Sequence, residues 1–188
     1  VGLAADLFQA MGSSVAELPG GEIVNAMKRG VIDGFEFNNP TSDRRFGAQD
    51  VAKYYMMGSH HQATEYFEIM FNKTKFNALP AEHKAILQYA AEAVSSANEW
   101  KAMDYYSKDL QELISKDKVN VQRTPKSVFD AQIKAWDGLI AQLGSDPFMK
   151  KVMDSQKAWV RRVVYYSMHN ARDYRGAFEH NFPGVLKV

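Results

Sequence analysis

The sequence contains no cysteine, and this absence removes three kinds of chemistry. Without thiols the chain forms no disulfide bond, binds no metal through thiolates and has no cysteine nucleophile. No apolar run approaches the roughly 18 residues that a membrane-spanning helix needs, although 46% of the residues are hydrophobic. Strong charge of one sign is also missing: the formal net charge is +1, and Arg44-Arg45 and Arg161-Arg162 are too short to form a basic tract. The charge pattern therefore favours neither nucleic acid nor a membrane surface as a partner.

Motifs of the common enzyme classes are absent as well. The chain has no G-x-S-x-G, no phosphate-binding P-loop and no G-x-G-x-x-G. Its serines and its five histidines follow no spacing typical of a catalytic triad. We therefore predict a protein that is not an enzyme and that carries no organic cofactor.

The periodicity of apolar residues, and the turn residues between them, predict helices that alternate with short strands. Such alternation is typical of an α/β fold with parallel strands. The predicted helices are Gly2–Met11, Glu22–Arg29, Thr41 to about Tyr55, Pro80 to about Lys116, Lys126–Leu143 and Pro147 to about Phe178. The predicted strands or extended segments are Ser14–Leu18, Val31–Phe37, Thr64–Asn72 and Val119–Arg123.

These elements predict a division of the chain into three parts. Residues 1–80 form an α/β lobe with ligand-facing strand ends, residues 81–118 a long connecting helix, and residues 119–188 a short strand followed by helices. At 1.5 Å per residue the connecting helix would be roughly 50 Å long, which exceeds the width of a small domain. Four strands and two very long helices make a poor closed domain. We interpret the chain as half of a larger α/β body.

Several stretches, taken in order, resemble the solute receptors of TRAP (tripartite ATP-independent periplasmic) transporters. The first stretch combines a strand, a turn, a helix, a glycine cap and a strand, in Glu17–Pro19, Gly21–Ile23 and Asn25–Gly34. The later stretches are Lys53–Tyr55, Phe67–Lys73, Leu79-Pro80 and Asp146–Phe148. Their order covers essentially the whole chain and resembles the α-keto acid and mannitol/chloroaromatic branch of the family.

The resemblance implies a periplasmic-binding-protein-like α/β fold, in which two lobes close on a ligand around a long hinge-spanning helix. It identifies the chain as the C-terminal part of such a two-lobe receptor, with the family's carboxylate-binding arginine outside it. It implies a periplasmic protein that binds a small 2-oxo, hydroxy or aromatic carboxylic acid and delivers it to the TRAP membrane subunits. It further implies a homodimer through the C-terminal helix, where an apolar stripe runs from Trp159 to Met168.

The first candidate site follows the predicted strand Val31–Phe37. In open α/β sheets ligands bind beyond the carboxyl ends of the strands. The resemblance assigns ligand contacts to Phe35, Glu36, Phe37 and Asn39, although the family often has Trp or Gln beside this glutamate. It also implies a sodium or calcium ion that bridges to the ligand, held by the Glu36 carboxylate and the Phe37 carbonyl, since such ions prefer oxygen ligands. An ordinary surface glutamate beside core aromatic residues is the alternative.

The second candidate site is the loop that contains His60-His61-Gln62. In the family this loop reaches into the ligand cleft, which implies that His61 contacts the ligand and that the amide oxygen of Gln62 completes the cation site. Adjacent histidines also suit a zinc site in a metal-dependent enzyme, but no third histidine is near in the sequence. A polar loop without any binding role is the simplest alternative.

Two classes of function are therefore compared. The first is an extracytoplasmic receptor for a small carboxylic acid, which the resemblance favours. The second is an α-helical oligomeric scaffold or interaction protein, in which the strands are minor. A metal-dependent enzyme that uses His60 and His61 is a third and less favoured reading.

Overall fold

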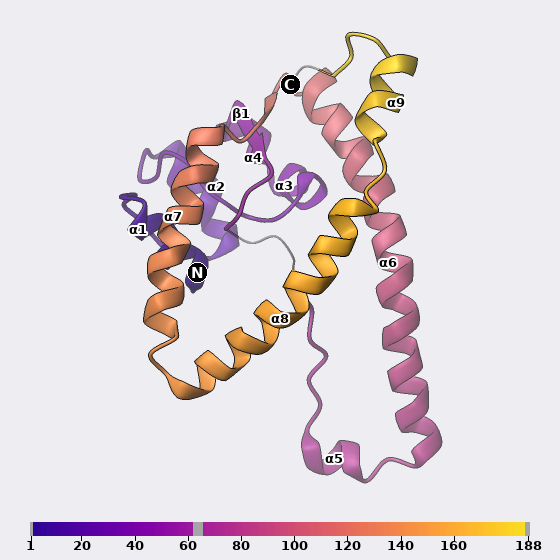
Figure 1. Ribbon diagram of the computed structural model, residues 1–188. Coiled ribbons are helices and arrows are strands. Elements are labelled where there is room, and N and C mark those ends of the chain that lie inside the picture. The colour runs from indigo at the N-terminus through magenta and orange to yellow at the C-terminus, as the bar shows by residue number, and fades with distance from the viewer. Residues whose placement is uncertain (1, 62–65, 187–188) are drawn as a thin grey trace. The chain divides into compact units, whose positions relative to one another are not determined.

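The structure, a computed structural model, describes residues 2–61 and 66–186 of the chain. Figure 1 shows the succession of helices and the two short strands in this part. The elements are α1 (Leu3–Ala10), α2 (Gly20–Lys28), α3 (Pro40–Phe46), α4 (Ala48–Val51), β1 (Tyr54–Met57), α5 (Lys73–Asn77), α6 (Ala81–Ser115), β2 (Asn120–Arg123), α7 (Lys126–Leu143), α8 (Pro147–His169) and α9 (Tyr174–Asn181). None of the helices in the described ranges is long and apolar enough to cross a membrane.

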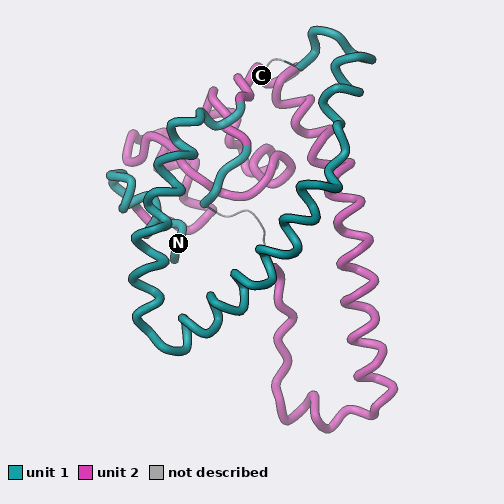
Figure 2. Tube along the Cα trace, viewed as in Figure 1, with its two compact units in different colours: residues 1–15, 58–61, 123–188 teal, residues 16–57, 62–122 magenta. Residues whose placement is uncertain are grey.

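Two compact units make up the chain, and each contains segments that are distant in sequence (Figure 2). Unit 1 contains α1, the loop Gly58–His61 and the chain from Arg123 onward, with α7, α8 and α9. Unit 2 contains Ala16–Met57 and the chain up to Gln122, with α2 to α6. The predicted parts 1–80, 81–118 and 119–188 follow chain order instead, and they stay a prediction about the intact protein.

In unit 1, α1 packs against α7. Leu7 of α1 has no exposed surface, and Ala4 and Ala5 are buried beside it. The helix ends as its sequence predicts, because Gly12 takes a φ of 93° that suits glycine. The N–H groups of Gly12 and Ser13 then donate to the carbonyls of Gln9 and Phe8, the two bonds of a Schellman cap. The predicted helix Gly2–Met11 is confirmed.

In unit 2, α2 ends in the same way at Gly30, whose φ is 68°. The N–H groups of Gly30 and Val31 donate to the carbonyls of Met27 and Ala26, at 3.1 and 2.9 Å. This cap turns the chain sharply from the helix into the segment that leads to Glu36. Apolar side chains that fill the core of this unit are Ile23, Ala26, Leu113 and Val119.

The sheet is smaller than the sequence predicts. Its two strands in the described ranges are β1 and β2, so the predicted strand Val119–Arg123 is confirmed. The predicted strand Val31–Phe37 is wrong, since this segment is irregular and belongs to no sheet. β-propensity describes how well side chains fit a pleated surface, but a strand also requires a neighbour whose N–H and C=O groups complete the ladder.

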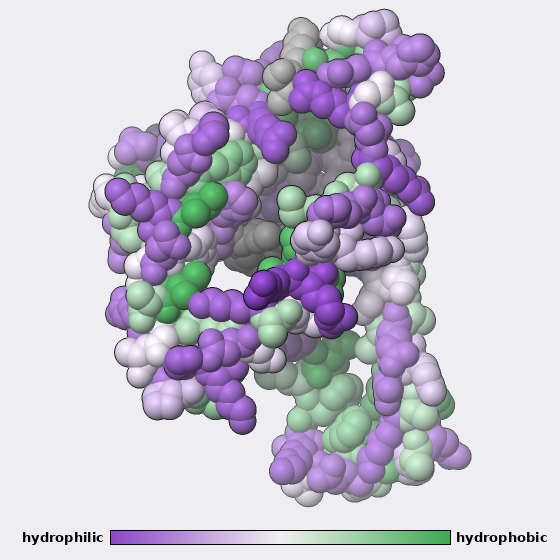
Figure 3. Space-filling view, viewed as in Figure 1, coloured by the Kyte–Doolittle hydropathy of each residue, from purple (hydrophilic) through white to green (hydrophobic). Residues whose placement is uncertain are grey.

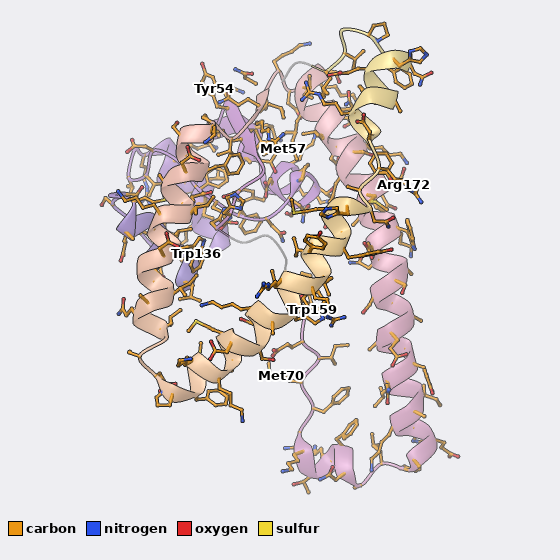
Figure 4. The ribbon with its side chains drawn as sticks, viewed as in Figure 1. Tyr54, Met57, Met70, Trp136, Trp159 and Arg172 are labelled. Atoms are coloured by element: carbon orange, nitrogen blue, oxygen red, sulfur yellow. The ribbon has the colours of Figure 1, made fainter. Side chains whose placement is uncertain are left out.

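Thr64 and Glu65 lie outside the described residues. In the part that the structure describes, the predicted buried strand Thr64–Asn72 is also wrong. From Tyr66 onward the segment has no strand, and its side chains are exposed, with 83% of Phe67 and 85% of Met70 accessible. Figure 3 shows hydrophobic surface along this approach to α5, and Met70 is labelled in Figure 4. The apolar pattern predicts burial, yet no described residue of unit 2 covers the side chains of Phe67 and Met70.

The predicted helix from Thr41 to about Tyr55 is interrupted at Gly47 and ends at Val51, so it is wrong as one continuous helix. Gly47 takes a φ of 91° and separates α3 from α4, and Tyr54 and Tyr55 lie in β1. Tyr54–Met57 forms a strand because it pairs with β2, and beside this pair the N–H of Asn120 donates to the carbonyl of Lys53 at 2.8 Å.

The three later helices follow the sequence more closely. The helix predicted from Pro80 to about Lys116 is the 35-residue α6, and Lys126–Leu143 is confirmed to the residue as α7. Asp146 caps α8 with Pro147 at its first position, as predicted. However, α8 ends at His169 instead of near Phe178, and the chain forms a separate α9.

Candidate functional site

The aromatic ring of Phe46 on α3 anchors the residues on both sides of Glu36. Phe35 meets this ring edge-on with centroids 5.6 Å apart, and Phe37 stacks on it at 4.8 Å. Glu36, between these two anchored rings, is exposed.

Gly20, at the start of α2, provides the space for the Phe37 ring. A Cβ atom at position 20 would lie 2.8 Å from Cε2 of Phe37 and 3.4 Å from its Cζ. A normal carbon–carbon contact is about 3.5–4.0 Å. The Pro-Gly-Gly turn thus serves the segment Phe35–Phe37 as well as the helix, because a larger residue at position 20 would displace Phe37.

Asn39 forms the N-cap of α3. Its Oδ1 accepts hydrogen bonds from the N–H groups of Thr41 and Ser42 at 3.1 and 3.0 Å, and its own N–H donates to Ser42 Oγ. This reciprocal pattern is a capping box, followed by proline at the first helical position. Asn39 therefore fixes the end of the Glu36 segment, and its predicted contact with a ligand stays a prediction.

Asp43 joins the segment that contains Glu36 to α3 and β1. Its Oδ1 accepts from the N–H of Asn38 at 3.2 Å, and its Oδ2 accepts from the hydroxyl of Tyr55 at 2.8 Å. Only 5% of Asp43 is exposed. Burial raises the pKa of the Asp43 carboxyl, and the hydrogen bonds from Tyr55 and Asn38 oppose this shift without cancelling it. Burial, together with the charge of Asp43, raises the pKa of Tyr55.

Arg44 ties α3 to the C-terminal end of α6. Its Nε donates to Asp117 at 2.9 Å, and its Nη1 pairs with Asp109 and Glu112. The hydrogen bond to Asp117 raises the pKa of the Arg44 guanidinium above its ordinary value. Through this arginine the short helix that carries Asn39 and Phe46 is held against the longest helix of unit 2.

The loop Gly58–His61, in unit 1, is held by α7. Its main chain at His60 is bound on both sides: the N–H donates to Oε1 of Gln132 at 2.9 Å, and the carbonyl accepts from Nε1 of Trp136 at 2.7 Å. Gln132 and Trp136 are one helical turn apart, so both side chains project from the same face of α7. Trp136 is labelled on α7 in Figure 4.

Side chains of the loop are fixed by the same helix and by α1. Nε2 of Gln132 donates to Ser59 Oγ at 2.7 Å, and Ser59 Oγ also accepts from the N–H of His61 and lies against its Nδ1. The ring of His60 packs on Phe129 at 5.1 Å, and the ring of His61 packs on Phe8 at 5.6 Å. The loop that carries His61 is therefore ordered by contacts within unit 1.

The predicted site residues fall into three groups. Phe35, Glu36, Phe37 and Asn39 lie together on one segment of unit 2, and His61 lies in unit 1. Gln62 lies outside the described residues. No cluster of three or more His, Asp or Glu side chains in the described ranges could hold a metal ion. The predicted sodium or calcium site uses one carboxylate, a main-chain carbonyl and an amide, and the exposed Glu36 beside the Phe37 carbonyl suits that set of oxygen ligands.

The residues that support the site were missed by the sequence analysis. Phe46, Asp43, Gln132 and Trp136 lie 5 to 76 positions from the groups they hold, and no local pattern joins them. Only the cap at Asn39 had a readable signal, because Asn-Pro-x-Ser places a capping side chain directly before proline at a helix start.

Comparison with protein families and curated proteins gives two matches. Residues 2–143 match the family described as bacterial extracellular solute-binding protein, family 7. The monocarboxylate 2-oxoacid-binding periplasmic protein all3028 of Nostoc sp. is 26% identical over 175 residues, which are 92% of this chain and 48% of the relative.

Two solved structures have the same fold. A TRAP periplasmic solute-binding protein of Colwellia psychrerythraea, with bound calcium and pyruvate, is 26% identical with a TM-score of 0.82. One of Pseudoalteromonas atlantica, with bound sodium and pyruvate, is 24% identical with a TM-score of 0.76. In both cases the match covers 95% of this chain and 54% of the other. The chain thus spans about half the length of the relatives that it matches, and the predicted fold class is confirmed.

Proposed function

Because this chain belongs to family 7 of the bacterial extracellular solute-binding proteins, we propose that it forms the C-terminal part of a periplasmic receptor for a small 2-oxo acid. The receptor binds pyruvate, or an acid of the same class, together with a calcium or sodium ion. It passes the acid to the membrane subunits of a TRAP transporter. The names of the relatives in Nostoc and Colwellia support the choice of ligand and ion.

The observation that carries this proposal is the way in which Glu36 is held. Phe35 and Phe37 both pack on Phe46, so the main chain that carries the exposed Glu36 is held on both sides. A segment that is already held loses less conformational entropy when it binds an ion. The ion then neutralises part of the negative charge that would otherwise repel a carboxylic acid from Glu36.

The other two functions have weaker support. An oligomeric scaffold would account for the exposed helices, and a metal-dependent enzyme would account for the adjacent histidines. Neither accounts for the family match over residues 2–143, and the relatives described above are solute-binding proteins. The proposal therefore keeps the receptor and assigns no catalytic residue.

Titration calorimetry on the full-length natural protein tests the proposal. Pyruvate is titrated in buffers that contain calcium, sodium or only choline as the added cation. We expect binding in calcium or sodium and a loss of at least about tenfold in affinity in choline. Glu36→Gln keeps the shape of the side chain but removes its charge. The affinity of this variant for pyruvate should therefore no longer depend on the added cation.

Glu22→Gln is the matched control, because Glu22 is also exposed and lies in the first turn of α2. This variant should bind pyruvate like the unaltered protein. Absence of heat with pyruvate and with other 2-oxo acids, in all three buffers, would contradict the proposed ligand class. Equal affinities of the Glu36→Gln and Glu22→Gln variants would contradict the role of Glu36.

A homodimer through α8 is a second part of the proposal. The apolar stripe predicted from Trp159 to Met168 is exposed in the chain, with 56% and 72% of these two side chains accessible. Apolar surface left in water costs about 25 cal/mol per Å², which favours a covering partner. Light scattering of the full-length protein should give the mass of two chains, and the mass of one chain at micromolar concentration would contradict this part.

A further inference from the structure

Ser59 contributes a hydroxyl with a single proton, and its surroundings determine where that proton goes. The N–H of His60 can only donate, so the atom of Gln132 that faces it is the amide oxygen, and the amide nitrogen faces Ser59. Ser59 Oγ therefore accepts from Nε2 of Gln132 and also from the N–H of His61. Both of its lone pairs are then used.

The remaining group near Ser59 Oγ is Nδ1 of His61. Because the hydroxyl has no further lone pair to offer, it donates its proton to Nδ1. Nδ1 is then an acceptor, and the neutral imidazole carries its proton on Nε2. The chain of bonds from Gln132 through Ser59 thus determines the tautomer of His61.

Burial of Gln132 stiffens its end of this arrangement. Only 2% of Gln132 is exposed, and both ends of its amide are used. A buried polar network in which each group is paired holds its members in one arrangement. Trp136 adds a second bond to the main chain of His60, from one helical turn further along α7.

We propose that Gln132 is a positioning residue that fixes His61 as its Nε2–H tautomer, so that His61 serves the ligand site as a hydrogen-bond donor. This inference rests on the proposed function, together with the predicted contact between His61 and the ligand. All oxygen atoms of such an acid are acceptors, and a histidine in the other tautomer would present an acceptor to them. Gln132 itself does not contact the ligand.

Nitrogen NMR of the full-length protein, labelled at histidine, tests the tautomer directly and needs no ligand. His61 should show Nε2 protonated and Nδ1 unprotonated at a pH where the ring is neutral. A protonated Nδ1, or an averaged signal from both tautomers, would overturn the proposal. Ser59→Ala removes the donor to Nδ1 and should move the His61 Nδ1 signal, while that of His83 in α6 stays in place.

Binding measurements test the consequence for the site. Gln132→Leu should lower the affinity for pyruvate, in calcium buffer, by about tenfold or more. The control is Leu139→Ala on the same helix, which removes apolar contact beside α1 but leaves the loop bonds in place. It should lower the melting temperature and keep the affinity within about twofold. Equal affinities of the two variants would overturn the positioning role.

Failure of the proposed function gives a different pattern. If the unaltered protein binds no pyruvate, hydrogen exchange at the His60 N–H still tests the loop. This amide should be protected in the unaltered protein and exchange faster in Gln132→Leu than in Leu139→Ala. Equal exchange in the two variants would overturn the role of Gln132. The expected difference would support that role and show that only the proposed ligand is wrong.

Discussion

Replacement of Gly20 by alanine tests whether the Phe37 ring is held between α2 and Phe46. The new Cβ would lie 2.8 Å from Cε2 of Phe37, and the ring would have to move by about 0.7 Å to restore a normal contact. Phe46 stacks on the same ring at 4.8 Å, which limits the directions in which it can move. Overpacking costs about 1–3 kcal/mol in a closed core, and because 37% of Phe37 is exposed, we expect a cost of about 1 kcal/mol, the lower end of that range.

Gly21 is the matched control, since a Cβ atom there meets no atom within 4 Å. Both glycines lie in the first turn of α2, and alanine at either position gains up to about 1 kcal/mol in helix propensity. That gain cancels in the comparison. The free energy of unfolding of Gly20→Ala should therefore lie about 1 kcal/mol below that of Gly21→Ala.

Urea denaturation of the full-length protein, followed by circular dichroism, measures this difference. Calorimetry with pyruvate should also show weaker binding for Gly20→Ala, because a displaced Phe37 no longer fixes Glu36. Equal unfolding free energies of the two variants, within about 0.5 kcal/mol, would refute the packing argument. If Gly20→Ala shows the expected loss of stability but binds pyruvate with unchanged affinity, the link between Phe37 packing and Glu36 is refuted.

Two further predictions concern the groups that hold α3. Burial raises the pKa of Asp43, so the folded protein binds this proton more tightly than the unfolded chain, whose carboxyl titrates near 3.8. The unaltered protein should therefore gain stability relative to Asp43→Asn as the pH falls through the raised pKa, and this gain should level off below pH 3.8. Denaturation experiments between pH 7 and 3.5 measure the difference in unfolding free energy, and a constant difference would contradict the raised pKa. Arg44→Ala leaves Asp109, Glu112 and Asp117 without their shared cation, and should cost about 1 kcal/mol more than Arg45→Ala at low salt. This excess should shrink in 1 M NaCl, and an excess that does not depend on salt would argue against an ionic tie.

Local chemistry made much of the helical structure predictable. Gly12 and Gly30 end α1 and α2 through left-handed caps, and Pro147 begins α8, as their positions in the sequence indicate. The long run without glycine or proline after Pro80 became α6. These features depend on interactions within about five residues, so the sequence pattern contains the information that specifies them.

Strands were predicted less well, because their stability comes from distant partners. Val31–Phe37 and Thr64–Asn72 have suitable side chains, but the described part of unit 2 pairs β1 with β2 instead. The residues Tyr54 and Tyr55 were assigned to a helix for the converse reason, since their pairing with β2 is not visible in a local pattern.

The sequence by itself determined the ends of α1, α2 and α7, the order of motifs that indicates the family and the choice of Glu36 as a candidate ligand residue. Tertiary structure decided which groups hold that segment and the His61 loop: Phe46 and Gly20 fix Phe37, and Gln132 binds Ser59 and His60. The physical reason is distance along the chain. A cap or a turn is completed by neighbours in sequence, whereas an aromatic stack or a buried amide bond requires that folding first bring remote residues together.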